Sequence, residues 1–404
     1  MKRCAITMNV NKRYRIQSLD IARGLAVLGI LLVNMRFYST SLQAIQWQVE
    51  LWPSWWDQVV TALLRLFVEG KFLAIFALLF GYGMVMSYQR AIEAGVRFVP
   101  MYTRRLLILA VFGLIHGLLV WYGDILLHYA LLGFLLLFFR KCAPKTLYTC
   151  ALLLLASVPA LLLLQGNPSA DLNSNEEFQA WLEQAIALDT TIYGSGDYRV
   201  ILQKRVEDWI SSTLNQVMFY PQILGLFLLG AGLAKQRILH EVGTTGRSLL
   251  RIAAVSGVMG IGITLIPLVW HGTESNGVQE ALRVLIGAPA MGLFYLIVLT
   301  IALGNKRWQR ILRPLGDVGR LALTNYLGQS LLCTLIFYGY GLGWFGKVGP
   351  LVGTLIAVVI FGVQLAVSRM WLRRFHMGPL EWLWRTGTYL SAPPMRRADR
   401  SITT

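Results

Sequence analysis

Apolar runs of about twenty residues recur along nearly the whole sequence, and a run of that length lets an α-helix cross a bilayer. Two examples are FLAIFALLFGYGMVM, which begins at Phe72, and LVGTLIAVVIFGVQLAV, which begins at Leu351. Neither run alternates apolar with polar residues as the strands of a membrane barrel do, so both predict helices. Hydrophobic residues fill 56% of the 404 positions and charged residues only 14%, which is too apolar for a soluble domain of this size. The sequence therefore predicts an all-α, polytopic helical membrane bundle, whose first partner is the lipid bilayer.

About ten transmembrane helices fit the pattern of apolar runs. The predicted spans are 19–37, 59–88, 106–121, 125–139, 146–164, 214–234, 252–270, 279–303, 318–340 and 350–371. The third and fourth spans are short and only the residues YGD separate their cores, so we expect them to form a tight hairpin.

The net charge of +17 comes from Lys and Arg residues that are dispersed at the ends of apolar runs. They form no basic domain, so we expect no nucleic-acid partner, whereas an excess of basic residues is typical of cytoplasmic loops. Basic clusters follow the even-numbered spans, which predicts that both termini are cytoplasmic. The oligomeric state stays open, and a homo-oligomer is compatible with the sequence. The predicted divisions are an N-terminal five-helix membrane half (1–164), an extracytoplasmic helical loop that caps the outer face (165–212), a C-terminal five-helix membrane half (213–375) and a cytoplasmic basic tail (376–404).

Polar residues inside apolar spans are the candidate functional residues, because an ionisable group in a bilayer costs roughly 2.5–3.5 kcal/mol and usually faces a bundle interior. In the first span, Asp20, Arg23 and Asn34 fall within a sector of about 60°, given the rotation of about 100° per residue. Alternatively, Asp20 caps the helix, Arg23 extends to the headgroups and Asn34 bonds a neighbouring helix.

Two further spans carry polar residues. In FVEGKFLAIF, Glu69 and Lys71 flank Gly70, and they form either a local ion pair or the two sides of a helix break at the glycine. The ninth span begins LGDVGRLALTNYLGQS, in which Arg320 and Asn325 either line the same chamber as the first span or hold helices together.

The predicted hairpin holds the most specific constellation. His116 lies near the outer end of the third span, Asp124 begins the fourth, and His128 follows Asp124 by one turn on the same face. A carboxylate that holds an imidazole fixes its tautomer and stabilises the imidazolium, so His116 and Asp124 suit general-base catalysis. A metal site needs at least one further ligand, and we predict none. The alternatives are that Asp124 caps the fourth helix and that the histidine bonds a backbone carbonyl.

Four motifs together resemble the YeiB-like family of bacterial inner-membrane proteins, and the final third of the chain resembles the C-terminal domain of that family. The resemblance implies a multi-pass protein of the bacterial inner membrane. The motifs are RIQSLDIARGLAVLGILLVNM from Arg15, FVEGKFLAIFALLFGYG from Phe67, GLIHGLLVWYGDILLHYALLG from Gly113 and GRLALTNYLGQS from Gly319.

The opening LDIARG motif also resembles that of heparan-α-glucosaminide N-acetyltransferase and related transmembrane acyltransferases. Those enzymes take acetyl-CoA from the cytoplasm and acetylate a sugar on the far side with an intramembrane histidine. The resemblance implies an acyl-CoA donor, a small-molecule, sugar or lipid-linked acceptor, and His116 as the catalytic histidine, with no tightly bound cofactor. The alternative is a transporter or exporter in which the same polar groups bind a small solute. The expected substrate-binding residues are Asp20, Arg23, Asn34, Glu69, His128, Arg320 and Asn325.

Overall fold

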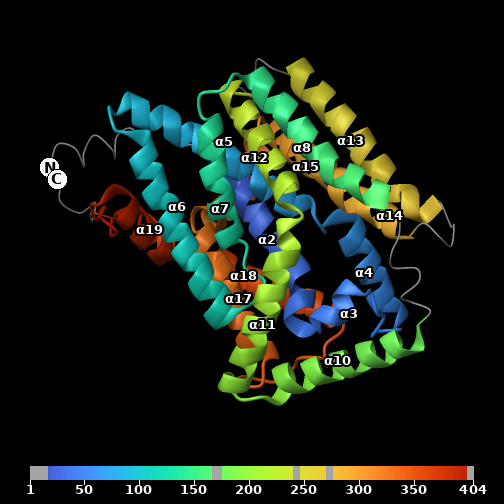
Figure 1. Ribbon diagram of the computed structural model, residues 1–404. Helices are drawn as coiled ribbons and strands as arrows, with labels where there is room; N and C mark the ends of the chain where they lie inside the picture. The colour runs from blue at the N-terminus through green and yellow to red at the C-terminus, as the bar shows by residue number, and fades with distance from the viewer. Residues whose placement is uncertain (1–16, 166–174, 240–245, 270–275, 398–404) are drawn as a thin grey trace.

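The computed structural model describes residues 17–165, 175–239, 246–269 and 276–397 (Figure 1). In these ranges the chain is helical, with one isolated antiparallel bridge between Phe375 and Arg396, so the predicted all-α class is confirmed. The N-terminal elements are α2 (Gln17–Ser39), α3 (Leu42–Gln46), α4 (Trp55–Phe67), α5 (Lys71–Glu93), α6 (Phe98–Ile115), the π-helical turn η1 (His116–Val120), α7 (Leu126–Leu136), η2 (Leu137–Phe139) and α8 (Pro144–Gln165). The remaining elements are α10 (Glu176–Ser195), α11 (Tyr198–Val217), α12 (Tyr220–Lys235), α13 (Gly246–Val269), α14 (Asn276–Leu282), η3 (Arg283–Gly287), α15 (Ala288–Ala302), α16 (Lys306–Arg320), α17 (Ala322–Phe337), α18 (Pro350–Arg374) and α19 (Pro379–Tyr389).

Among the described residues, 6 helices are long and apolar enough to cross a membrane, or up to 7 if the bent pair α11–α12 counts as one span. The shorter apolar helices include α17 and the Leu126–Phe139 segment. The chain is therefore a multi-pass membrane protein, but the predicted number of ten spans is not confirmed. The predicted hairpin of the third and fourth spans is present, because α6 packs against α7.

The prediction of a single span over 59–88 is wrong, because α4 ends at Phe67 and α5 begins at Lys71. Gly70 lies between them with a φ of 76°, in the left-handed region that glycine adopts without steric cost. The predicted span over 318–340 corresponds to α17, but its start differs. There α16 ends at Arg320, Leu321 has non-helical backbone angles, and α17 begins at Ala322.

Helix α2 lies inside the bundle and packs against α5, α16, α17 and α18 (Figure 1). Its contact with α16 brings two backbones together, because a Cβ at Gly24 would overlap the Leu315 carbonyl and a Cβ at Gly319 would overlap the Asp20 carbonyl. Small residues at a helix crossing allow such close packing inside membranes. The contact joins the first helix of the chain to one near its C-terminal end.

Helices α10 and α11 occupy the predicted loop at 165–212, of which residues 166–174 lie outside the described part, and α10 runs along the lower edge of the view in Figure 1. Asn175 and Asp197 cap their N-termini by accepting backbone N–H bonds. Lys204 on α11 pairs with Asp189 on α10 at 2.9 Å and with Asp208 on its own helix at 2.6 Å. The Lys204–Asp189 pair joins α10 to α11, and we call these two helices the α10–α11 cap after the predicted loop.

The predicted tail at 376–404 contains α19, and its residues 398–404 lie outside the described part of the chain. Helix α19 packs against α6 and α17. The Arg105 guanidinium lies 4.1 Å from the Trp384 ring centroid, and the Trp384 indole donates to the Arg105 carbonyl at 2.8 Å. The segment after α18 is thus part of the packed bundle.

Candidate functional site

His116 and Asp124 form a buried pair within the α6–α7 hairpin. Their side chains are joined by a hydrogen bond of 2.9 Å between Nδ1 and Oδ1, and each residue is 1% exposed. Asp124 Oδ2 also accepts the backbone N–H of Leu127 at 2.8 Å, so the carboxylate caps α7 as well. An ionised Asp124 can only accept, so Nδ1 of His116 is the donor in this bond, and in the neutral imidazole Nε2 then carries the lone pair. That Nε2 atom is buried and has no hydrogen-bond partner among the described residues.

Local backbone structure explains how the pair forms. Helix α6 changes at His116 into the π-helical turn η1, which ends where the Trp121 N–H donates to the His116 carbonyl at 2.8 Å. A single π-helical turn is common at functional sites, since the extra residue redirects side chains. On the facing side, a Cβ at Gly113 would lie 2.7 Å from Asp124 Oδ2. Glycine at 113 therefore permits the close approach of the carboxylate.

Further buried polar atoms surround the π-helical turn η1. Arg205 on α11 donates from Nη1 to the Leu119 carbonyl at 2.6 Å, and the Trp209 indole nitrogen faces Gly117 so closely that a Cβ there would overlap it. We define the π-turn cluster as His116, Trp121, Arg205, Trp209 and Tyr338, each of which has at least one buried side-chain nitrogen or oxygen without a partner among the described residues. The sequence analysis missed Arg205 and Trp209, because they lie in the segment assigned to the cap.

His128 is buried on α7, but its hydrogen bond goes to Tyr220 on α12, at 2.8 Å from Nδ1 to the hydroxyl. The structure therefore places His128 at the α7–α12 contact and gives it a partner outside the His116–Asp124 pair. Within the ranges that the structure describes, no group of 3 or more His, Cys, Asp or Glu side chains is arranged to hold a metal ion.

The LDIARG motif lies at the other end of the bundle. Arg23 Nη1 bonds Asp20 Oδ1 at 3.2 Å, and Arg320 donates to the His376 carbonyl at 2.9 Å. Asn34 lies half-buried about 21 Å further along α2, at 1.5 Å per residue, so it does not share a site with Asp20. Arg90 lies within electrostatic range of three other arginines, and we define the arginine cluster as Arg23, Arg90, Arg105 and Arg385.

Glu69 takes part in a second polar group, in which Lys71 and Arg283 are buried and Glu69 is partly exposed. It pairs with Arg283, from Nη2 to Oε2 at 2.8 Å, whereas the fully buried Lys71 donates to the Arg65 carbonyl at 2.6 Å. The break at Gly70 is therefore present, and Glu69 finds its partner on another helical segment. We define the Arg283 cluster as Arg65, Glu69, Lys71, Glu280 and Arg283.

Asn325 connects α17 to α18. Its side chain donates to the Val318 carbonyl at 3.2 Å and to the Ser368 hydroxyl at 3.1 Å, and its own carbonyl accepts from Gln364 at 2.9 Å. Gln329 donates to Gln364 at 2.8 Å and extends the network. These bonds favour the interpretation that Asn325 holds helices together.

Glu381 on α19 caps α17 from outside that helix, a contact that the sequence analysis missed. Its Oε1 accepts the backbone N–H groups of Leu323 at 2.8 Å and Thr324 at 3.0 Å, and Oε2 accepts the Thr324 hydroxyl at 2.6 Å. Burial raises the pKa of the Glu381 carboxyl above its ordinary value, and the hydrogen bonds oppose that shift.

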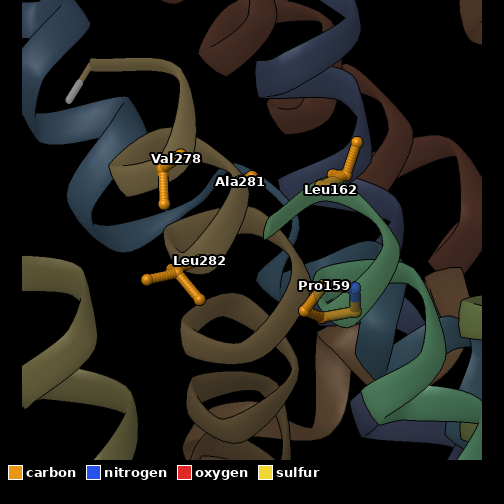
Figure 2. Close-up of a pocket in the computed structure, with 5 residues that line it drawn as sticks. All are labelled: Pro159, Leu162, Val278, Ala281 and Leu282. Atoms are coloured by element: carbon orange, nitrogen blue, oxygen red, sulfur yellow. The ribbon is translucent and has the colours of Figure 1, made fainter. Parts of the chain in front are cut away.

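An apolar pocket lies between α8 and α14 (Figure 2). The residues that line the pocket have no polar side chain that could bind a substrate. None of them belongs to the hairpin that holds His116 and Asp124. The lining residues are Pro159, Leu162, Val278, Ala281 and Leu282.

The helices and their buried polar interior define the chain as a multi-pass, all-α membrane protein. Residues 233–391 match the family described as protein of unknown function (DUF418). The chain is 40% identical to uncharacterized protein YxaH of Bacillus subtilis (strain 168), covering 96% of this chain and 97% of the relative. It is 31% identical to uncharacterized protein YeiB of Escherichia coli (strain K12), covering 93% and 97% respectively. The protein belongs to this YeiB-like family, as its motifs predicted, and the names of these relatives state no activity.

Proposed function

We propose that the protein is a transmembrane acyltransferase that moves an acyl group from acyl-CoA to a hydroxyl or amine acceptor at the opposite membrane face. One observation carries the proposal: a buried histidine is held by a carboxylate through Nδ1, while its Nε2 has no partner among the described residues. A purely structural histidine at this depth would be expected to satisfy both ring nitrogens, since an unpaired buried polar atom costs about 1–3 kcal/mol.

In the proposed reaction, Nε2 of His116 takes the proton of the acceptor as the acceptor oxygen or nitrogen attacks the thioester carbonyl. Asp124 stabilises the resulting imidazolium through Nδ1. The carbon–sulfur bond then breaks, and the imidazolium returns its proton to the departing thiolate. The products are the acylated acceptor and free CoA, and His116 recovers its starting protonation state.

The arginine cluster is the proposed binding region for the CoA phosphates, and Asp20 and Arg320 are expected to line the cytoplasmic entry together with Arg23 of the cluster. Guanidinium groups bind phosphate oxygens through paired hydrogen bonds. Arg105 precedes His116 by about 16 Å along α6, at 1.5 Å per residue. An extended pantetheine arm suits that separation, so a donor anchored at Arg105 would present its thioester near Nε2.

In the proposed orientation both termini and the arginine cluster are cytoplasmic, in the inner membrane of a bacterium. The α10–α11 cap then covers the outer face. The basic residues Lys306, Arg307 and Arg310 at the start of α16 fall on the cytoplasmic side in this orientation, which agrees with the basic character of cytoplasmic loops.

The test measures release of the free CoA thiol by the purified full-length protein, with acetyl-CoA as donor and amino sugars or extracted membrane lipids as acceptors. His116→Ala should lower the rate by about 10²–10⁴-fold. His116→Asn should lower it similarly while keeping a donor toward Asp124, which separates lost chemistry from lost folding. Acceptor-dependent thiol release at the wild-type rate in both variants would exclude His116 as the base.

A further inference from the structure

Arg205 is a fully buried cation without an anionic partner. Its side chain is 0% exposed, and within the part of the chain that the structure describes no carboxylate oxygen lies within ion-pair distance of it. Of the nearest acids in sequence, Glu207 is exposed, and Asp208 accepts from Lys204 at 2.6 Å and from Tyr193 at 2.7 Å. A buried charge is normally paired, because removing an ion from water costs several kcal/mol.

The unused donors of Arg205 form one edge of its guanidinium. Nη1 donates to the Leu119 carbonyl, and the guanidinium also forms a hydrogen bond with the Tyr340 side chain. Nε and Nη2 are the atoms that are buried without a hydrogen-bond partner among the described residues. The N–H groups of Nε and Nη2 are parallel, so together they form the fork that grips two oxygens of a phosphate or carboxylate. The two nitrogens of Arg205 that can bind an oxyanion together, Nε and Nη2, are therefore the two without a hydrogen-bond partner among the described residues.

Other donors without partners lie near this fork. The indole nitrogens of Trp121 and Trp209 and the hydroxyl of Tyr338 are buried and have no hydrogen-bond partner among the described residues. The Arg205 guanidinium carbon is 5.8 Å from the Tyr338 ring centroid, and Trp209 contacts the same η1 turn whose carbonyl Arg205 binds. The indole groups can only donate, so the region has an excess of donors over acceptors.

We propose that the Arg205 fork, with the Trp121, Trp209 and Tyr338 donors, binds a phosphate group beneath the α10–α11 cap. A phosphate supplies three or more oxygens in a tetrahedral arrangement and can accept from several directions, whereas a carboxylate offers two oxygens in one plane. The inference rests on the proposed function in one respect: the phosphate belongs to the acyl acceptor. That acceptor is either a soluble organic phosphate or a lipid with an anionic phosphate headgroup.

The test titrates the purified full-length protein with two probes by calorimetry, without any acyl donor. Glycerol 3-phosphate represents the soluble source, dioctanoyl phosphatidylglycerol represents the lipid source, and glycerol and dioctanoylglycerol are the phosphate-free controls. Arg205→Gln should weaken binding of the active probe by at least about tenfold, and Arg205→Lys should weaken it less, because lysine keeps the charge without the fork. Arg199→Gln makes the same charge change at an exposed position of α11 and should leave the affinity unchanged.

Trp209→Phe removes one donor and keeps Arg205, so a smaller loss of affinity in this variant supports the site even if Arg205→Gln does not fold. Absence of binding by both probes would overturn the proposal, as would equal affinity in wild type, Arg205→Gln and Trp209→Phe. Phosphate binding through Arg205 without any acyl transfer would refute the proposed function and leave this site standing. If the protein transfers acyl groups and Arg205→Gln leaves the KM for the acceptor unchanged, the phosphate site is refuted and the proposed function stands.

Discussion

Two arginines are buried to a similar degree in this protein, yet their surroundings differ. Arg283 is 3% exposed and bonds Glu69, Glu280 and the Arg65 carbonyl, so each of its nitrogens has a partner. Arg205 is 0% exposed, and its hydrogen bonds go to neutral groups, the Leu119 carbonyl and the Tyr340 side chain. The protein therefore compensates one buried cation with its own carboxylates and leaves the other with an open guanidinium edge.

This difference indicates a structural role for Arg283 and a ligand-binding role for Arg205. In the Arg283 cluster, the ion pair between Arg283 and Glu69 joins η3 to the segment between α4 and α5, where Gly70 breaks the helix. At the π-turn cluster, donors without acceptors lie close to a histidine whose Nε2 also has no hydrogen-bond partner in the described ranges. Polar groups that are costly to bury and are left unpaired are typical of sites where function is maintained at the expense of stability.

The largest expected effect is at Asp124, and it tests whether the π-turn cluster acts in chemistry. Asp124→Asn keeps an oxygen for the Leu127 N–H but no longer fixes the His116 tautomer, so acyl transfer should fall by about 10²–10⁴-fold. Thiol release measures the rate, and the thermal unfolding temperature in detergent should stay close to wild type. An unfolding temperature that falls while the rate is preserved would assign Asp124 to capping alone.

The next effect tests the compensated arginine. Arg283→Met leaves Glu69 and Glu280 without their ion-pair partner, and because these side chains are 37% and 30% exposed, solvent screens part of the loss. The free energy of unfolding should fall by about 2–3 kcal/mol. Arg205→Met should change it by less than about 1 kcal/mol, because the variant removes an uncompensated charge along with its hydrogen bonds to neutral groups. Denaturant titration of both variants in the same detergent gives the comparison, and equal losses would show that the two arginines have the same role.

Gly113→Ala should have an intermediate effect, because its Cβ would collide with Asp124 and with the first turn of α7. We expect the free energy of unfolding to fall by about 1–3 kcal/mol and thiol release to fall as well. Gly262→Ala is the matched control on α13, where a Cβ meets nothing within 4 Å. That control should be neutral or stabilising by up to about 1 kcal/mol.

The smallest effect concerns Glu381, a buried carboxylate satisfied by neutral donors. Its pKa is raised by burial above 4.5, so the folded protein holds this proton to higher pH than the unfolded chain does. The resulting stability is complete below pH ~4.5 and is lost as pH rises through the folded pKa. Glu381→Gln should flatten this part of the pH dependence of the unfolding temperature, and an unchanged slope would assign it to another group.

The His116–Asp124 pair could be predicted because both residues lie in one hairpin, eight positions apart. Arg205 and Trp209 could not, since they meet the π-helical turn η1 from a helix about 86 residues further along the chain. The break at Gly70 was one of two alternatives, because an apolar run looks continuous when a single glycine turns left-handed. Glu381 accepts hydrogen bonds from backbone N–H groups 57 and 58 residues away, and a backbone donor is the same for every residue type except proline, so the sequence does not indicate it.

The contact between α2 and α16 has a consequence for relatives of this protein. The matched family region, 233–391, includes Gly319 but not Gly24, although each glycine makes room for the other helix. A hybrid that joins the N-terminal part of one relative to the C-terminal part of another should fold only when both positions, 24 and 319, are glycine. The DUF418 region, 233–391, is therefore a portion of a larger folding unit, and it should not be stable when produced without the first helix.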